Sequence, residues 1–354
     1  MIKTIPYLEV ISPTTFKPIE IVEPKECWFE LSFFEVGEFE VYAPATQRNL
    51  KVLKNGNFVK IPKMRYIWVI TSIEYTFTAG GSRMISAKGF ECKWLLQNCI
   101  IHNSSLALPK TVSAAFVRLF ERFFKTYYQT GYGVELINID TEISDPVATR
   151  GNLLEFLNKM TKTYGCGINA VYSVDQINFR LLQGQDRSAT IKFSQSRDNL
   201  LSFKYLSDAT NIANTAFVVA KVNDKEYSTS FSYVPNEPKK TIIIVESNQT
   251  NKYIDEVSDE ITLDLTKPSD FSLFSSWLQE EGKLALANHI NKTKITSEID
   301  LINSNYVFET DYQLGDIVEV KDEYFNITAK PRIVKYTIAL ESTGKVTEAL
   351  EFDE

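Results

Sequence analysis

The sequence predicts an α+β fold that is mainly β, with two similar small β-barrels and an α+β insert between them. A glycine turn followed by strands of alternating polarity occurs twice, at Gly56–Phe90 and Gly315–Phe352, and helical periodicity replaces the alternation between the copies. A doubled module changes the architecture of a chain. We therefore expect a first β-barrel domain over residues 1–105, an insert over 106–188 and a second β-barrel domain over 189–354.

The apolar faces of the two copies align. Setting Gly56 on Gly315 matches apolar residues in the first strands, and a shift of two more residues does so in the second. Because every second side chain of a strand lies on one face, we predict that the matched residues form the core of both barrels. The pairs are Val59 with Val318, Ile61 with Val320, Ile73 with Val334, Tyr75 with Tyr336 and Phe77 with Ile338. A chance match between amphipathic strands is the alternative.

The first domain is expected to be almost entirely β. Residues 7–10 and 19–22 form an opening hairpin by alternation, and strands at 27–33 and 38–42 follow it. A short helix is expected within 43–54, because it ends at an Asn-Gly pair that is typical of a helix stop.

The insert is expected to contain two helices and a hairpin. Apolar residues recur at three and four positions from Val112 to Tyr127, which predicts an amphipathic helix with an aromatic core stripe. Asn152 followed by Glu155 predicts the start of a second helix, and Gly165 its end. The alternation over 168–182 predicts the hairpin.

The last domain returns to strands, and it carries one more helix at about 271–292. The segment 223–240 has turn residues and two prolines, so it is expected to be a loop or a long hairpin tip. Strands are expected at 190–193, 200–206, 216–222, 241–246 and 296–301.

Composition narrows the possible functions. The chain has 354 residues, a net charge of −7 and scattered basic residues, which argues against binding to a phosphate backbone and so against sequence-specific recognition of nucleic acid. The start has no apolar signal region, and no apolar run approaches ~18 residues. We therefore expect a soluble chain, folded in a cytoplasm, without membrane insertion.

The residues offer no catalytic, cofactor-binding or metal-binding motif. The four cysteines form no C-x-x-C pair and are expected to be buried thiols, and His102 and His289 stand apart from any G-x-S-x-G elbow. The acidic run at 253–264 lacks the order and central glycine of a calcium loop. A glycosidase needs only two carboxylates at the right distance. The chain has 45 acidic residues, so such a pair is expected by chance and is no evidence for glycan hydrolysis. We expect no enzyme, no cofactor and no metal.

The order of these parts resembles the siphophage tail-hub family, whose fold is similar to that of the central hub of contractile phage baseplates. The resemblance spans nearly the whole chain. It lies in the opening hairpin, in the segment Val36–Val41 followed by a proline, in the glycine-led strand pair, in the helical insert, and in Leu314–Val318 with Arg332–Val334 near the end.

The resemblance implies a homotrimeric ring with two similar barrels in each subunit. Such a ring joins a six-fold tail tube to a three-fold tail tip around the DNA exit channel. Its partners would be distal tail and tail-tube proteins above and a tail fibre, spike or lysin chain below. It would be part of the virion at the phage tail tip, and assembled in the bacterial host cytoplasm.

Some members of the family continue into a peptidase, a glycan hydrolase or a fibre-like extension, and here we expect those activities on another chain. Two alternatives remain. One is a carbohydrate-binding or glycan-hydrolysing surface module, which the abundant aromatic residues allow. The other is the equivalent hub of a contractile injection device.

Overall fold

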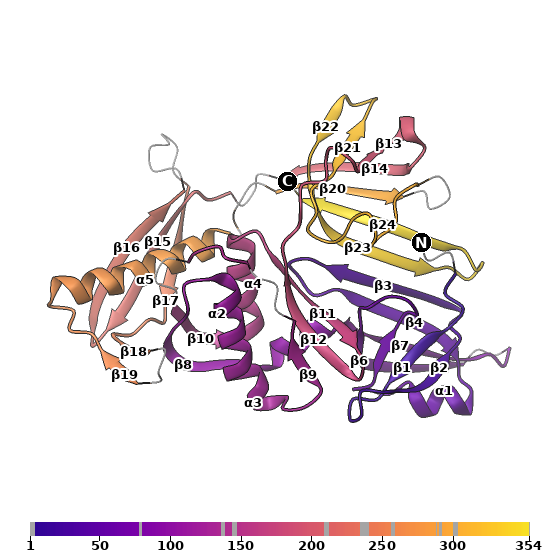
Figure 1. Ribbon diagram of the computed structural model, residues 1–354, viewed down its shortest axis with the longest axis horizontal. Coiled ribbons are helices and arrows are strands. Elements are labelled where there is room, and N and C mark those ends of the chain that lie inside the picture. The colour runs from indigo at the N-terminus through magenta and orange to yellow at the C-terminus, as the bar shows by residue number, and fades with distance from the viewer. Residues whose placement is uncertain are drawn as a thin grey trace.

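The computed structural model describes residues 4–77, 80–135, 139–143, 147–208, 212–233, 241–255, 259–287, 289, 292–299 and 304–353. Figure 1 shows three parts in a row. An eleven-stranded sheet lies at one end, a helix-rich insert in the middle, and a three-stranded sheet with a long helix at the other end. The α+β class with a majority of strands is therefore confirmed.

The eleven-stranded sheet contains the early copy and the last two strands of the late copy, whose segments Glu319–Asp322 and Ile327–Ala329 belong to a separate three-stranded sheet. Its strands alternate in burial: β3 (Glu26–Ser32), for example, buries Cys27, Phe29 and Leu31 against the core. The strands follow one another in the order β14-β20-β24-β23-β3-β4-β7-β6-β5-β1-β2. Their bounds are β14 Leu200–Asp208, β20 Lys292–Ile299, β24 Val346–Asp353, β23 Arg332–Leu340, β4 Glu38–Pro44, β7 Arg83–Glu91, β6 Trp68–Phe77, β5 Phe58–Lys60, β1 Leu8–Ile11 and β2 Pro18–Val22.

The two small β-barrels are not confirmed, because no sheet within the described ranges closes on itself. Strand β23 of the late copy pairs along Lys335–Leu340 with β3 of the early copy, so the two copies continue into each other. Residues of both copies belong to one hydrophobic core. Alternating polarity specifies a half-buried strand, and it does so equally in a closed barrel and in an open sheet.

The aromatic helix of the insert is confirmed and has a π-helical segment in its middle. It consists of α2 (Val112–Leu119), the π-helical segment Phe120–Phe124 and α3 (Lys125–Tyr127). Phe120 is fully buried between other aromatic rings, with ring centroids 4.6 Å from Phe124 and 5.2 Å from Phe179. The aromatic stripe is therefore core.

The second helix of the insert, α4 (Leu153–Thr163), begins and ends at the predicted residues. The Asn152 side chain accepts a hydrogen bond from the Glu155 amide at 3.1 Å, and Gly165 has φ +66° just after the helix. The remaining elements of this part are the 3₁₀ helix Cys92–Asn98 and the strands β8 Ile100–Ala107, β9 Tyr132–Val134, β10 Val147–Asn152, β11 Gly167–Ser173 and β12 Gln176–Leu182.

The third part is a small sheet covered by α5 (Pro268–Leu286). Its strands are β15 (Thr215–Val222), β16 (Lys225–Ser232) and β17 (Ile242–Ser247). Strand β16 lies in the segment that was expected to be a loop or hairpin tip, because turn residues at both ends masked its short alternation. Helix α5 begins and ends earlier than the predicted 271–292, and residues 288, 290 and 291 of that range lie outside the described residues.

Short elements complete the chain: α1 Gln47–Val52, β13 Lys192–Ser194, the 3₁₀ turn Gln195–Arg197, β18 Lys252–Ile254, β19 Glu260–Thr262, β21 Glu319–Asp322 and β22 Ile327–Ala329. None of the helices built from described residues is both long enough and apolar enough to cross a membrane.

Candidate assembly site at two sheet edges

A glycine turn opens the repeated unit, and its early copy is held by two backbone hydrogen bonds. Gly56 has φ +89°, a conformation that glycine adopts without strain. Its amide donates to the carbonyl of Ile70 at 2.8 Å, and the Ile70 amide donates to the carbonyl of Asn57 at 2.9 Å. The turn therefore fixes where the first strand meets β6.

The late copy has the same geometry. Gly315 also has φ +89°. Its amide donates to the carbonyl of Ile333 at 2.8 Å, and the Ile333 amide donates to the carbonyl of Asp316 at 2.8 Å. Ile333 of β23 thus occupies the position that Ile70 occupies in β6.

A β-bulge follows at the same place in each copy. The pairing of β6 with β7 shifts between Ile70 and Ser72, and that of β23 with β24 shifts between Ile333 and Lys335. The hydrogen bonds therefore support an alignment that moves the second strand by two residues from the one expected. A period-two pattern looks the same after such a shift, so the sequence could not reveal it.

The residues predicted to form the repeat core divide into three groups. Tyr75 and Phe77 are exposed, at 60% and 80%, and so do not belong to a core; among the described residues this end of β6 pairs with β7 alone, and its other edge has no partner. Ile73 and Val334 are partly buried against the core. The other six are buried: Val59, Ile61, Val318, Val320, Tyr336 and Ile338.

The joint between the copies is a continuous antiparallel pairing. Ile338 of β23 lies opposite Phe29 of β3, and both side chains are fully buried. Lys335 reaches diagonally across the joint to Glu30, with Nζ 3.0 Å from Oε2. Burial raises the pKa of Glu30, and the hydrogen bond and charge of Lys335 oppose that shift. Apolar packing and one charge pair thus hold the late copy to the early copy.

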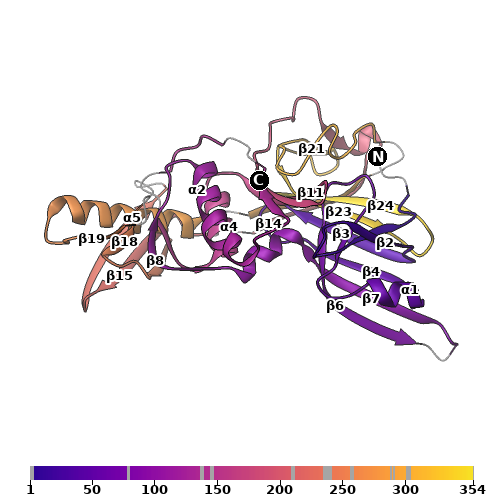
Figure 2. The same cartoon turned by 60° about the horizontal axis from the view of Figure 1, so that its bottom comes forward.

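Besides the outer edge of β2, which ends the sheet beside β1, two edges of the sheet lack such a joint in the described chain. Strand β14 is the last strand on one side. Strand β6 pairs with β5 only at Val69 and Trp68, so its length from Thr71 onward has no partner on that side. In Figure 2 the ends of β6 and β7 project away from the rest of the sheet. Both edges carry exposed apolar side chains, namely Tyr75, Phe77, Leu201, Tyr205 and Leu206.

A buried ion pair lies at the end of β7, between Glu91 and Lys93. Lys93 Nζ lies 3.6 Å from Glu91 Oε2, and both side chains are inaccessible to solvent. Glu91 accepts hydrogen bonds from the amides of Gly37 and Ser32, and Lys93 donates to the Ser32 carbonyl and to the Ile168 carbonyl of the insert. Burial raises the pKa of Glu91 and lowers that of Lys93. The pair ties the early copy to the insert.

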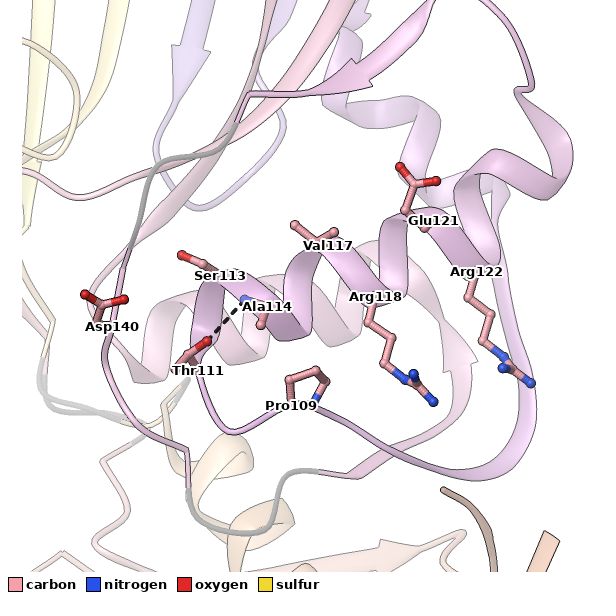
Figure 3. Close-up of a pocket in the computed structure, with 9 residues that line it drawn as sticks. All are labelled: Pro109, Thr111, Ser113, Ala114, Val117, Arg118, Glu121, Arg122 and Asp140. Carbon is pink, nitrogen blue, oxygen red and sulfur yellow. Dashed lines mark hydrogen bonds between the residues drawn. The ribbon is translucent and has the colours of Figure 1, made fainter. Parts of the chain in front are cut away.

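A pocket of about 730 Å³ lies beside α2 (Figure 3). Thr111 Oγ1 accepts from the Ala114 amide at 3.3 Å and caps the helix, and Ser113 Oγ accepts from the Ile139 amide at 2.7 Å. Arg118 donates to a backbone carbonyl at 2.7 Å. These polar groups have structural contacts, and the lining residues include no histidine or cysteine. The pocket is lined by Pro109, Thr111, Ser113, Ala114, Val117, Arg118, Glu121, Arg122 and Asp140.

The groups considered from the sequence do not gather into a reactive site. His102 is exposed with its ring centroid 5.2 Å from that of Phe123, and His289 follows the end of α5. The four cysteines are buried free thiols, as predicted, and burial raises the pKa of Cys27, Cys99 and Cys166 to about 12. In the described ranges, no three His, Cys, Asp or Glu residues group in a way that could hold a metal ion.

Solved structures with a similar fold include bacterial and prophage tail proteins. A tail protein from Neisseria meningitidis MC58 matches with a TM-score of 0.59 and 14% identity, over 98% of this chain and 96% of that one. The 43 kDa tail protein of prophage MuSo2 from Shewanella oneidensis matches with 0.58 and 10%, over 98% of both chains. Prophage tail protein gp18 from Listeria monocytogenes EGD-e matches with 0.50 and 12%, over 98% and 94%. No family model and no curated protein matches the sequence.

The chain therefore has the fold of phage tail proteins along its whole length, and the resemblance to the tail-hub family is confirmed at the level of the fold. The feature that the sequence did not reveal is the pair of open edges at β6 and β14. One signal was present: apolar residues occur on both faces of the run Leu200–Leu206, whereas a strand with one solvent-exposed face alternates.

Proposed function

We propose that the chain is a structural hub protein of a phage tail tip or baseplate. Three copies form a ring around the DNA exit channel and join the six-fold tail tube to the three-fold tip. The observation that carries this proposal is the doubled unit: the early and late copies share a glycine turn, a bulge and a sheet, and the sheet has an open edge at each copy.

The symmetry follows from the duplication. Each chain carries an early and a late copy of the repeat, so a ring of three chains presents six near-equivalent repeat copies. The rest of each chain occurs three times, so the ring as a whole has only three-fold symmetry. A contact between the late copy in one chain and the early copy in the next is heterologous, so it can close a ring and cover the free edges of β14 and β6. The internal joint already pairs a late unit with an early one.

The remaining properties fit a structural role. The net charge of −7 suits a channel through which DNA slides without adhering. The ring would bind distal tail and tail-tube proteins on one side and a fibre, spike or lysin chain on the other. It would lie in the virion at the tail tip after assembly in the host cytoplasm, in a siphophage tail or in a contractile or prophage-derived particle.

The test is the copy number in solution and in the assembled tail. Light scattering should give three times the chain mass of 40.4 kDa for the chain alone, or three copies of the chain in each complex, after subtraction of the partner's mass, where the tail-tube partner nucleates the ring. An image of the assembled tail should show three copies with both unit types facing the channel. Six copies per ring, or a channel lined by one unit type alone, would contradict the proposal.

A further inference from the structure

We propose that strand β6 of one copy pairs with strand β14 of the next copy, in the same register in which β23 pairs with β3 inside the chain. The inference rests on the proposed ring, and it adds the contact that builds it. Strand addition at an open edge is a common form of protein association, because the free backbone groups of both edges become hydrogen-bonded.

The first step is the equivalence of β6 and β23. Ile70 and Ile333 make the same two hydrogen bonds with the glycine turn, and each precedes the same bulge. Counting onward from these two residues, Tyr75 of β6 takes the position of Ile338 in β23. The edge of β23 that contains Ile338 is covered by β3, and the matching edge of β6 is open.

The second step is the equivalence of β14 and β3, which the pairing across the sheet establishes. In the early copy, directly paired residues run across four strands as Ile70, Gly89, Phe39 and Phe29. In the late copy, they run as Ile333, Phe352, Ile295 and Tyr205. Tyr205 of β14 therefore takes the position of Phe29 in β3.

These two steps fix the register of the contact. Inside the chain Ile338 lies opposite Phe29. Between chains, Tyr75 of one copy should lie opposite Tyr205 of the next, with Phe77 opposite Phe203. The strands are antiparallel in both cases.

Side-chain exposure agrees with this register. Phe29 and Ile338 are fully buried in the internal joint, whereas the matching Tyr75 and Tyr205 are 60% and 43% exposed. Aromatic side chains that lie opposite each other on paired strands stabilise the pairing. The contact would thus remove from water two aromatic residues at positions that are already core elsewhere in the same sheet.

Charge agrees as well. In the internal joint Lys335 and Glu30 are diagonal neighbours and form an ion pair at 3.0 Å. In the proposed register Glu74 and Lys204 of the next copy are diagonal neighbours of the same kind, with the charges exchanged. Diagonal neighbours lie within reach of long side chains. Both residues are exposed, and neither makes an ion pair within the described part of the chain.

The occupant of the two edges is therefore a second copy of this chain. A strand from a different tail protein could also pair with an open edge. It would have no reason to match the spacing of Tyr75 and Glu74 against Tyr205 and Lys204, so the register distinguishes the two.

Disulfide trapping tests the register. The full-length chain carrying Tyr75→Cys and Tyr205→Cys should form a covalent trimer on mild oxidation in the presence of the tail-tube partner, because directly opposite residues on paired strands have Cα atoms roughly 5.5 Å apart, within disulfide range. The matched control carries Tyr75→Cys and Lys204→Cys. A slip of one residue turns the second thiol to the other face, so this variant should remain uncrosslinked. The native thiols are buried and should not compete.

Charge exchange gives a second readout that does not depend on oxidation. Glu74→Lys and Lys204→Glu should each lower the trimer fraction in light scattering, and the double variant should restore it. Unchanged thermal unfolding of the monomer would show that the single variants still fold.

The outcomes separate this inference from the proposed function. A trimer without the Tyr75–Tyr205 disulfide, or with a disulfide in the control, overturns the register and leaves the hub standing. Covalent chains that extend without closing support the strand contact and overturn the trimeric hub. Chains that stay monomeric and uncrosslinked in assembled tails overturn both.

Discussion

Replacement of the two repeat glycines by alanine should give unequal losses of stability. Both glycines have φ +89°, where an alanine costs roughly 1 to 2 kcal/mol of strain. A Cβ at Gly56 would have no atom within 4 Å. A Cβ at Gly315 would lie 2.3 Å from Cε2 of Phe33, which is fully buried. That ring also lies close against Gly167, so it has little room to move.

The clash adds an overpacking cost of about 1 to 3 kcal/mol. We therefore expect Gly56→Ala to cost about 1 to 2 kcal/mol and Gly315→Ala about 2 to 5 kcal/mol of unfolding free energy. Urea unfolding of the two variants measures the difference, and the entropy lost by the unfolded chain cancels between them. Gly344→Ala, at φ +83° with open space around it, is a control within the late copy. Equal losses at Gly56 and Gly315 would refute the reasoning.

Three further variants test the core. Phe120→Ala should cost about 3 to 5 kcal/mol in urea unfolding, while Tyr127→Ala, 58% exposed on the same helix, should cost under ~0.5; a small loss at Phe120 would place it at an interface. Lys93→Met should cost about 3 to 5 kcal/mol, because it leaves the Glu91 carboxylate buried without its cation, and added Glu91→Gln should recover much of that loss; no recovery would show that packing dominates. Burial raises the pKa of Glu348, so the protonated form favours folding: the wild type should be relatively most stable below the ordinary glutamate pKa of about 4.3 and lose stability as the pH rises through the raised pKa. In the Glu348→Gln variant, the thermal unfolding temperature should depend less on pH between pH 4 and 7. An unchanged dependence would contradict the role given to Glu348.

Local patterns in the sequence predicted the local elements well. Asn152 and Glu155 marked the start of α4, and the three-and-four spacing from Val112 marked α2, because caps and helical faces depend on residues a few positions apart. The glycine turns at Gly56 and Gly315 were also visible, and both adopt the conformation that made glycine necessary.

The sequence could not show which strands pair with one another in the sheet. The joint between Phe29 and Ile338 connects residues from opposite ends of the chain, and no local pattern encodes such a pairing. Alternation also predicted Tyr75 and Phe77 to be core, but both are exposed. Alternation shows which side chains share one face of a strand, and it does not show whether other residues pack on that face. An exposed apolar residue at a free sheet edge and a buried core residue occur in the same alternating sequence pattern.

The two copies have the same glycine turn but different charged residues at their strand edges, and this difference affects assembly. A single chain with identical copies and two open apolar edges could pair in any order and grow without closing. Here the internal joint uses Lys335 with Glu30, and the proposed external contact uses Glu74 with Lys204, so the charge order is reversed between them. If β6 paired instead with β3 in this register, Glu74 would take the position of Thr337 and lie directly opposite Glu30, and like charges oppose that arrangement. The charges would thus disfavour the pairing of β6 with β3, and they explain why near-equivalent joints need not be interchangeable.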